Sequence, residues 1–498
     1  MTHGVGGPPG FRLGRAVSGL TEWCYRDAAI FGIFVAVVVA GYAVIARRIG
    51  VADFSPDSWS YFELAKSVFS DHFYQFNNRR SYVPGVHSAA FPFGYPVVLA
   101  LLGAVFGSNP LVGLYFNVAT VFGSALVLER VAARLGLRVL IRLALACVLV
   151  LNPFYMDEVL SARSIPFAIL LFLAGLLLAL ENRAFWSGLC LGAASLVRFD
   201  AVPMSAIAFV LFALFVGRTR RNALMMAAGL ILSMAPWAVY SHRFFGKFWV
   251  SDNSWVAASA VKAYVLDYPA APTIGARQAP GLWLHRVLDN VRSLYLALRA
   301  LSQTLWPALA LLAVATWRLH RWPTRRAVGF LATIAGLALT LVPYLMTGYF
   351  NTRYFVLPYV LLTLLVFWAA SVPPAAFARV ASWLAAVLLI ALTVPDGVSA
   401  LKAILATGEG RQAELQEELG TIAQLSACHE RTQQTTFIFR RDAANFSFRY
   451  AALTGQRAAT LPSNIDSLSA AQRKDYFSVM LPYALVDDPR RCPTTVLQ

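Results

Sequence analysis

Long apolar stretches separated by short polar and basic segments dominate the hydropathy pattern of the chain. About eleven of these stretches approach the ~20 residues that a helix needs to cross a bilayer. They lie at 27–46, 110–128, 138–153, 164–180, 185–199, 201–217, 222–241, 296–316, 328–347, 353–370 and 379–395. The stretches that meet at Arg198-Phe199-Asp200 are short, so they form either two spans or one helix pair with a buried turn. The pattern predicts an all-α polytopic membrane protein.

Basic residues gather in alternate connections between the apolar stretches. They are Arg130, Arg134, Arg138 and Arg142, then Arg218, Arg220 and Arg221, then Arg318, Arg321, Arg325 and Arg326. Because cytoplasmic loops carry an excess of Lys and Arg, we place these connections and the N-terminus in the cytoplasm. The other connections, including the long outer loops 47–109 and 242–295, then face the exterior. Loops of this length between membrane helices are usually functional.

The C-terminal region is much less apolar than the rest. Residues 410–424 have the pattern of a charged helix, and residues 435–440 that of a strand. We therefore expect a transmembrane module over 1–395, followed by a small exterior domain over 396–498 that is α/β or irregular.

Composition supports a membrane protein, because 58% of the residues are hydrophobic and only 13% are charged, about half the charge of a soluble protein. A net charge of +17 does not favour nucleic acid as a partner, since the arginines lie between apolar segments as membrane topology requires. Neither a zinc-site spacing nor a P-loop or dinucleotide motif occurs. Of the five cysteines, Cys428 and Cys492 lie in the exterior region, where we expect a disulfide.

The segment that begins at Ser55-Pro56-Asp57 follows the first apolar stretch and contains the first catalytic candidate. A carboxylate at the membrane rim must face water or have a function, because burying it in lipid is costly. Asp57 therefore suits a general base for an acceptor hydroxyl. The same letters also suit a helix N-cap, and both interpretations stay open. Residues 57–70 predict a partly amphipathic helix, either lying along the membrane surface or simply packing against the protein.

Two adjacent acids, Asp157 and Glu158, lie in the short outer connection 154–163 and precede Arg163. They are candidates for binding a metal, orienting an acceptor or supplying the base. The alternative is a pair of solvated loop charges neutralised by Arg163.

Cationic and aromatic side chains near the outer rim are candidates for binding a phosphate and a sugar. An arginine there can clamp a phosphate with two hydrogen bonds, or extend to lipid headgroups. The cationic candidates are Arg353, Lys66, Arg243 and Arg198, the last of which we expect to point into the protein because it is flanked by apolar segments. The sugar or acceptor candidates are Trp59, Tyr61, His87, Tyr95 and Trp255. His87 has the alternative of an ordinary surface residue.

Two motifs give the chain a family resemblance. Pro56-Asp57-Ser58-x-x-Tyr61-x-x-x-Ala65, followed by Pro92-x-Gly94-Tyr95-Pro96, resembles the GT-C superfamily of integral-membrane glycosyltransferases. The nearest groups by pattern are the bacterial lipopolysaccharide sugar transferases and the protein mannosyltransferase-like proteins. Weaker similarities are Gly188 to Arg198, with its two spaced glycines, and Arg353-Tyr354-x-x-x-Pro358.

The resemblance implies an inverting transfer from a polyprenyl-phosphate-linked sugar to a lipid, glycan or protein acceptor. It places the enzyme in the bacterial inner membrane, with a periplasmic active site and C-terminal domain. Asp57 matches the family's catalytic carboxylate, Asp157 and Glu158 match its acidic second outer loop, and Arg353 would stabilise the departing phosphate. The family often has a second acid directly after the first, where this chain has Ser58. We therefore expect no required cofactor, and a divalent metal is doubtful.

Two other functions stay open. A ligase or polymerase for lipid-linked glycans shares the topology and would use the basic residues of the large outer loop, His242, Arg243, Arg277, His285 and Arg286. A transporter would show internal repeats and interrupted helices meeting at the midplane. No internal repeat is evident, and the acids cluster at the rim and not in the middle of the spans, so the transferase is favoured.

Overall fold

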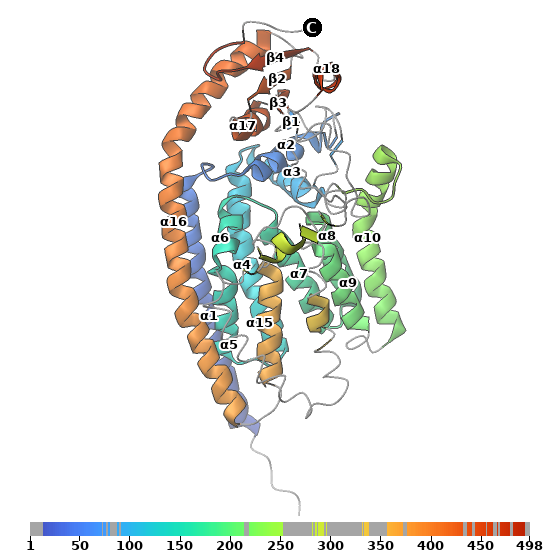
Figure 1. Cartoon of the computed structure of the whole chain (residues 1–498). Helices are drawn as coiled ribbons and strands as arrows, with labels where there is room; N and C mark the ends of the chain where they lie inside the picture. Colours follow the sequence, from blue (N-terminus) through green and yellow to red (C-terminus); the bar gives the residue numbers. More distant parts are fainter. Residues whose placement is uncertain are drawn as a thin grey trace, which may run out of the picture.

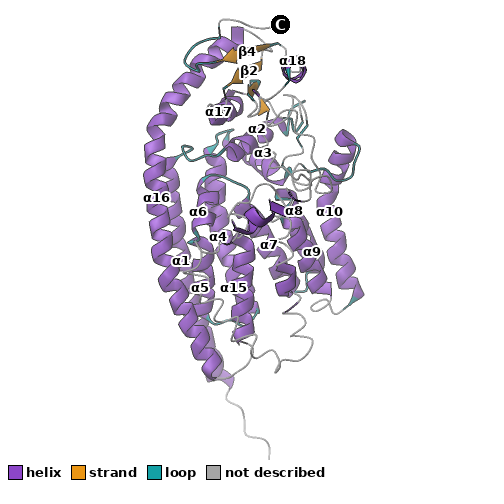
Figure 2. Cartoon of the chain, viewed as in Figure 1, coloured by secondary structure: helices purple, strands orange, loops and turns teal. Residues whose placement is uncertain are grey.

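The structure is a computed structural model of the whole chain. It describes residues 13–71, 73–75, 78–79, 87–88, 91–213, 219–251, 281, 284–285, 287–292, 295, 331, 333–337, 356–371, 376–431, 436–440, 444–454, 456–461, 466, 469–478 and 482–493. The described residues form a bundle of roughly parallel and antiparallel helices, with a small α/β unit at one end (Figures 1 and 2).

The apolar stretches form the helices of this bundle. They are α1 (Leu13–Ile49), α4 (Leu111–Arg134), α5 (Val139–Val150), α7 (Ile165–Leu180), α8 (Ala184–Val197), α9 (Ala201–Leu211), α10 (Arg220–Phe245), α15 (Val356–Ser371) and α16 (Ala376–Arg431). Nine predicted spans thus coincide with helices, while 296–316 and most of 328–347 lie outside the described residues.

Not every described helix is long enough to cross a bilayer alone. Four are long and apolar enough, and a fifth span forms if α5 is counted together with the short helix that follows it. The others, such as α7, α8 and α9, are apolar but shorter than 18 residues. The chain is an all-α polytopic membrane protein, as the hydropathy pattern predicts.

Helices α8 and α10 pack closely because small residues line their contact. A Cβ built on Gly188 would lie 1.9 Å from the carbonyl oxygen of Met226, and one on Gly229 would lie 2.1 Å from that of Phe185. Only glycine permits this separation of the two backbones. The seam fixes α8, whose C-terminal end carries Arg198.

The connection 154–163 is not the loop that we expected. It contains a short helix, α6 (Pro153–Leu160), bent by 54° from α5. The Oδ1 of Asn152 accepts hydrogen bonds from the backbone N–H groups of Phe154 and Tyr155, and Pro153 occupies the first turn. Asn followed by Pro is a strong helix start, which explains the difference.

The connection between α1 and α4 contains α2 (Pro56–Ser67) and α3 (Gly94–Phe106). The helix predicted from Asp57 is therefore present, and its burial agrees with the alternative of a helix that packs against the protein. Residues 58–65 are all buried, so every side of the helix is covered. Helix α2 lies across the end of the bundle, beneath the α/β unit (Figure 1).

The α/β unit is built on a parallel sheet with strand order β1-β3-β2-β4. Its strands are β1 (Asn78–Arg79), β2 (Thr436–Phe439), β3 (Ala458–Thr460) and β4 (Tyr483–Val486). Strand β1 lies in the connection between α2 and α3, and it pairs with β3 of the C-terminal region. The predicted strand at 435–440 is confirmed as β2, and the expected α/β character holds.

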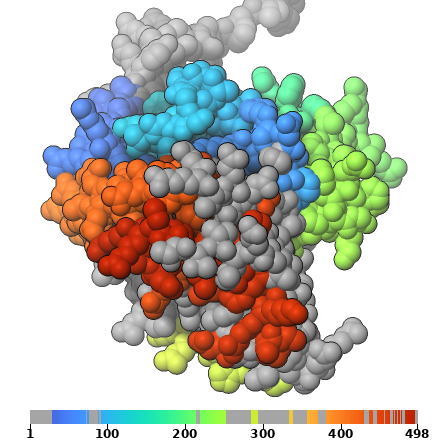
Figure 3. Space-filling model, turned by 90° about the horizontal axis from the view of Figure 1, so that it is seen from above, coloured from blue at the N-terminus to red at the C-terminus, as the bar shows by residue number. Residues whose placement is uncertain are grey.

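Helices cover both faces of this sheet. Phe437 and Phe439 of β2 pack against α16 and α17 (Ala444–Thr454), whereas Ile438 faces the side of α18 (Ala470–Ser478). This alternation follows from the two-residue period of a strand. Figure 3 looks down on this end and shows the C-terminal residues in red beside α16 in orange.

Helix α16 links the membrane bundle to the α/β unit without interruption. It runs for 56 residues through Pro395 and past residue 396, where we placed the domain boundary. The predicted charged helix at 410–424 lies within the second half of α16. Cys428 near its end forms a disulfide with Cys492, as expected, with the two Cα atoms 5.8 Å apart.

Candidate functional site

The candidate site lies where the start of α2 meets the end of α6. Ser55 is the N-cap of α2: its Oγ accepts a hydrogen bond from the N–H of Ser58, and the Ser58 hydroxyl accepts one from the N–H of Ser55. Asp57 lies inside the first turn and is not the cap. The partial positive charge of a helix N-terminus stabilises a carboxylate at this position.

Arg163 joins the two connections. Its Nε donates to the Oγ of Ser55 at 2.9 Å, and its Nη1 donates to Asp157 at 2.8 Å and to Glu158 at 2.7 Å. The Ser58 hydroxyl adds a further hydrogen bond to the backbone carbonyl of Ser161. The acidic pair of α6 and the first turn of α2 are therefore held against each other.

A left-handed residue turns the chain so that Arg163 can reach back. Ala162 has φ 51° and is fully buried, a conformation that costs an L-residue about 1–2 kcal/mol. The Arg163 N–H then donates to the carbonyl of Glu158. Asn117 of α4 supports this turn, since its Nδ2 donates to the carbonyl of Arg163 at 2.7 Å.

A fourth acid, Asp53, lies just before α2. It forms an ion pair with Arg411 of α16. Desolvation raises the pKa of Asp53, and the negative charge of Asp157 raises it further, against the opposing effects of Arg411 and Arg163. The charge of Asp157 thus acts on Asp53, so acids of both connections lie in one electrostatic environment.

The two acids of α6 differ in access to solvent. The Glu158 side chain is fully buried, whereas that of Asp157 is 47% exposed. Glu158 thus pairs with Arg163 inside the protein and presents no surface to an acceptor. Asp157 can contact water and Arg163 together. Neither acid is a fully solvated loop charge, because α6 holds both against Arg163.

The described cationic candidates do not converge on one point. Arg198 is 14% exposed and forms a two-pronged ion pair with Asp200, so it points into the protein as expected. Lys66 donates to the carbonyl of Ala452 at 2.5 Å, at the far end of α2 from Asp57. Arg243 is exposed near the end of α10. Arg353 lies outside the described residues.

Three of the aromatic candidates need correction. Trp59, Tyr61 and Tyr95 are 1%, 3% and 0% exposed, so no sugar can stack on their faces in this structure. Their roles are internal: the Tyr61 hydroxyl lies 2.8 Å from the Oγ of Ser164, and the Tyr95 hydroxyl donates to Asn117. Burial lowers the pKa of His87, and its ring packs on Phe244. Trp255 lies outside the described residues.

Sequence reasoning missed several residues that shape the site. Asn117 carried a usable signal, because a polar side chain inside the apolar span 110–128 is unusual. Arg411 and Arg449 carried none, since Asp53 and Trp59, the residues that they contact near the site, lie more than 350 positions away. Within the described residues, no group of three or more His, Cys, Asp or Glu side chains is arranged to hold a metal ion.

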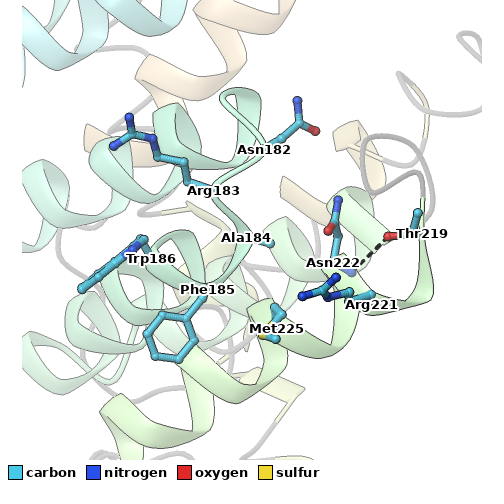
Figure 4. Close-up of a pocket in the computed structure, with 9 residues that line it drawn as sticks. All are labelled: Asn182, Arg183, Ala184, Phe185, Trp186, Thr219, Arg221, Asn222 and Met225. Atoms are coloured by element: carbon cyan, nitrogen blue, oxygen red, sulfur yellow. Dashed lines mark hydrogen bonds between the residues drawn. The ribbon is translucent and has the colours of Figure 1, made fainter.

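A separate hollow of about 670 Å³ lies at the other end of α8 (Figure 4). The turn before α8 and the start of α10 line it, with Arg183, Trp186, Arg221 and Met225 among its residues. Helix α8 spans about 21 Å at 1.5 Å per residue, so this hollow is remote from the acids of α2 and α6.

Comparisons with known proteins identify the fold. No protein-family model matches the chain, and no curated protein sequence matches it. Similar solved structures include ArnT from Cupriavidus metallidurans bound to undecaprenyl phosphate, with a TM-score of 0.50 and 11% identity over 86% of this chain and 85% of that one.

The oligosaccharyltransferase of Archaeoglobus fulgidus is also similar. Its apo form has a TM-score of 0.52 and 11% identity, covering 90% of this chain and 68% of that one. Its complex with zinc and sulfate has a TM-score of 0.50, 11% identity, and covers 90% and 67%. Similarity at this level of identity concerns the fold alone, so the chain shares the fold of ArnT and of this oligosaccharyltransferase.

Proposed function

We propose that this protein is a membrane glycosyltransferase that moves a sugar from a polyprenyl-phosphate donor to a lipid, glycan or protein acceptor. The observation that supports the proposal is the hydrogen bond from Arg163 to Ser55, which joins the first turn of α2, where Asp57 lies, to the helix that carries the acids of α6. The similar ArnT structure holds undecaprenyl phosphate, which supports the donor class. The sequence resemblance supports the periplasmic face of a bacterial inner membrane.

In the proposed reaction the acceptor hydroxyl attacks the anomeric carbon of the donor sugar. Asp57 takes the hydroxyl proton as the new C–O bond forms. The bond between the anomeric carbon and the phosphate oxygen breaks, and its electron pair leaves with the polyprenyl phosphate. Attack from the face opposite the leaving group inverts the anomeric centre.

The acids of α6 would then have different roles. Asp157 is partly exposed and is the second candidate to contact the acceptor. Glu158 is buried, so it would act through Arg163 by holding the guanidinium toward Ser55. This network would fix the first turn of α2, and preorganised groups of this kind lower a barrier without moving during the reaction.

The departing phosphate needs a fixed positive charge. Arg353 is our proposed clamp, from its match to the family motif, with Arg243 as a second contact. Lys66 is not part of this phosphate clamp, because its ammonium group donates hydrogen bonds to two backbone carbonyls of α17. The proposed chemistry requires no cofactor.

The test uses purified protein in lipid nanodiscs with a panel of polyprenyl-monophosphate sugars and candidate acceptors. Mass spectrometry would follow the release of polyprenyl phosphate from wild type, Asp57→Asn and Asp157→Asn. We expect one donor to turn over and Asp57→Asn to abolish that turnover. Full turnover by Asp57→Asn would exclude it as the base, and loss in Asp157→Asn alone would assign the base to Asp157.

A second candidate function is the transfer of a whole lipid-linked glycan. The similarity to an oligosaccharyltransferase favours it, at a TM-score of 0.52. Release of polyprenyl diphosphate from a diphosphate-linked glycan, with no turnover of any monophosphate donor, would decide for this function.

A further inference from the structure

The C-terminal α/β unit, which we here call the exterior unit, contacts α2, the helix that carries Asp57. The contact is made by a buried arginine. The guanidinium carbon of Arg449, on α17, lies 5.4 Å from the ring centroid of Trp59 on α2. Trp59 follows Asp57 by two residues. The indole also contacts Phe54, with the ring centroids 5.3 Å apart. Trp59 is thus held between the exterior unit and the segment that precedes α2.

Arg449 is itself fixed in the protein. It is only 8% exposed and forms an ion pair with Glu418 of α16. Burial lowers the pKa of Arg449 to about 10, which leaves it charged at neutral pH. A buried guanidinium requires compensation, and an aromatic face together with a carboxylate supplies it. The interaction therefore ties the membrane-anchored helix α16 to α2.

Two further contacts hold the same surfaces together. Lys66 at the end of α2 donates to the carbonyls of Ala452 and Leu453 in α17. Strand β1, from the connection after α2, pairs with β3, aligning Asn78 with Ala458. The far end of α2 and the chain beyond it are therefore anchored to the exterior unit independently of Arg449.

We propose that Arg449 is a positioning residue for Asp57: through the face of Trp59 it sets the rotation of the first turn of α2. This inference rests on the proposed function. Residues two apart on a helix lie about 200° apart around its axis. A rotation that frees Trp59 therefore moves the carboxylate of Asp57 sideways. With side chains reaching about 5–6 Å from the axis, a 10° rotation shifts them by about 1 Å.

A shift of that size is large enough to affect a reaction. A misplacement of about 1 Å can lower a rate by roughly a hundred-fold. A residue that only stabilised the exterior unit would change the amount of folded enzyme but not the turnover of each folded molecule. The two roles are therefore separable by kinetics on folded, purified protein.

The experiment compares Arg449→Met, Arg449→Lys and wild type in nanodiscs, using the polyprenyl-monophosphate sugar that wild type turns over. We expect Arg449→Met to lower kcat by at least about ten-fold with KM for the donor unchanged, because the base and not donor binding is displaced. Arg449→Lys keeps a cation over the ring and should recover much of kcat. Amide exchange within residues 56–67 should be faster in Arg449→Met.

Arg490→Met is the matched control. Arg490 belongs to the same unit and pairs with Glu417, the neighbour of Glu418, but its side chain is 71% exposed. We expect wild-type kcat from this variant. Should Arg449→Met fail to fold, Trp59→Leu removes the ring face from the other side and must give the same loss of kcat.

Three results separate the inference from the proposed function. Wild-type kcat in Arg449→Met, with Asp57→Asn inactive, overturns the inference alone. Equal losses in Arg449→Lys and Arg449→Met also overturn it, because the cation would then not be the feature that matters. Full turnover in Asp57→Asn overturns the proposed base, whatever the Arg449 variants do.

Discussion

The Nε of Arg163 donates a hydrogen bond at 2.9 Å to the Oγ of Ser55, which lies 108 positions earlier in the chain. Ser55 also caps α2, and Arg163 also holds both acids of α6. One contact therefore connects the helix that carries Asp57 with the helix that carries Asp157 and Glu158.

Replacing Arg163 with Met should destabilise the protein strongly. Glu158 is fully buried, and removing its cation leaves an uncompensated charge, which typically costs about 3–5 kcal/mol. Thermal unfolding in detergent or nanodiscs measures the change. Arg183→Met is the control, because the Arg183 side chain is 66% exposed and its pair with Glu181 is long, at 3.9 Å. An unchanged melting temperature in Arg163→Met would show that Glu158 is neutral or hydrated.

The cap at Ser55 gives a smaller and more local prediction. Ser55→Ala removes the acceptor for the Ser58 N–H and the partner of Arg163, and loss of an N-cap costs about 1 kcal/mol. We expect faster amide exchange at the start of α2 and a reduced kcat. Ser55→Thr keeps the hydroxyl and should behave like wild type. Equal effects of the two substitutions would rule out the hydroxyl as the cause.

Much of the bundle could be predicted from the sequence because hydropathy alone determines which segments can be buried in lipid. The same holds for the helix after Ser55 and the strand at 435–440, which local patterns describe. These features depend on residues that are close together in the chain. The disulfide could be anticipated because Cys428 and Cys492 are the cysteines of the exterior region.

The geometry of the site could not be predicted in the same way. Tyr61 of α2 and Tyr95 of α3 are the residue type of a sugar-binding rim, yet both are buried. Whether an aromatic residue faces solvent depends on what packs over it. Here Phe91 and Ser164 lie against Tyr61, and Phe116 and Ala162 lie against Tyr95. The contact of Arg449 with Trp59 could not be predicted for the same reason, because the two residues are almost 400 positions apart.

The seam between α8 and α10 should not accept any side chain at Gly188. A Cβ there would lie 1.9 Å from the Met226 carbonyl, so Gly188→Ala should cost about 1–3 kcal/mol through overpacking. Gly32→Ala is the matched control in α1, where a Cβ would meet nothing within 4 Å. That substitution should be neutral or stabilising by up to about 1 kcal/mol. Thermal unfolding of both variants tests the seam.

Asp53 should make stability depend on pH in a defined direction. Its pKa is raised above 3.8 in the folded protein, so the folded state binds its proton more tightly than the unfolded state does. Its contribution to stability is therefore complete below pH 3.8 and is lost as the pH rises through the raised pKa. We expect Asp53→Asn to be at least as stable as wild type at pH 7, with wild type gaining relative to it as the pH falls towards 4. Melting temperatures of both across this range test the sign, and the opposite trend would show that the ion pair with Arg411 outweighs desolvation.

The disulfide should stabilise the C-terminal α/β unit by restricting its unfolded state. Cys428 and Cys492 are 64 positions apart, and closing a loop of that size is worth about 4 kcal/mol in the chain-entropy model. The double substitution Cys428→Ser with Cys492→Ser should therefore lower the unfolding temperature of the exterior unit, and a reducing agent should lower that of wild type to the same value. The reducing agent should leave the double variant unchanged. Cys190→Ala is the control for thiol substitution as such, since Cys190 is a free cysteine in α8.

Because Arg449 lies in the same unit as the disulfide, reduction should also weaken the contact between Arg449 and Trp59. Amide exchange in α2 should then become faster. Exchange in α2 that stays constant while the exterior unit melts would show that the two are not coupled.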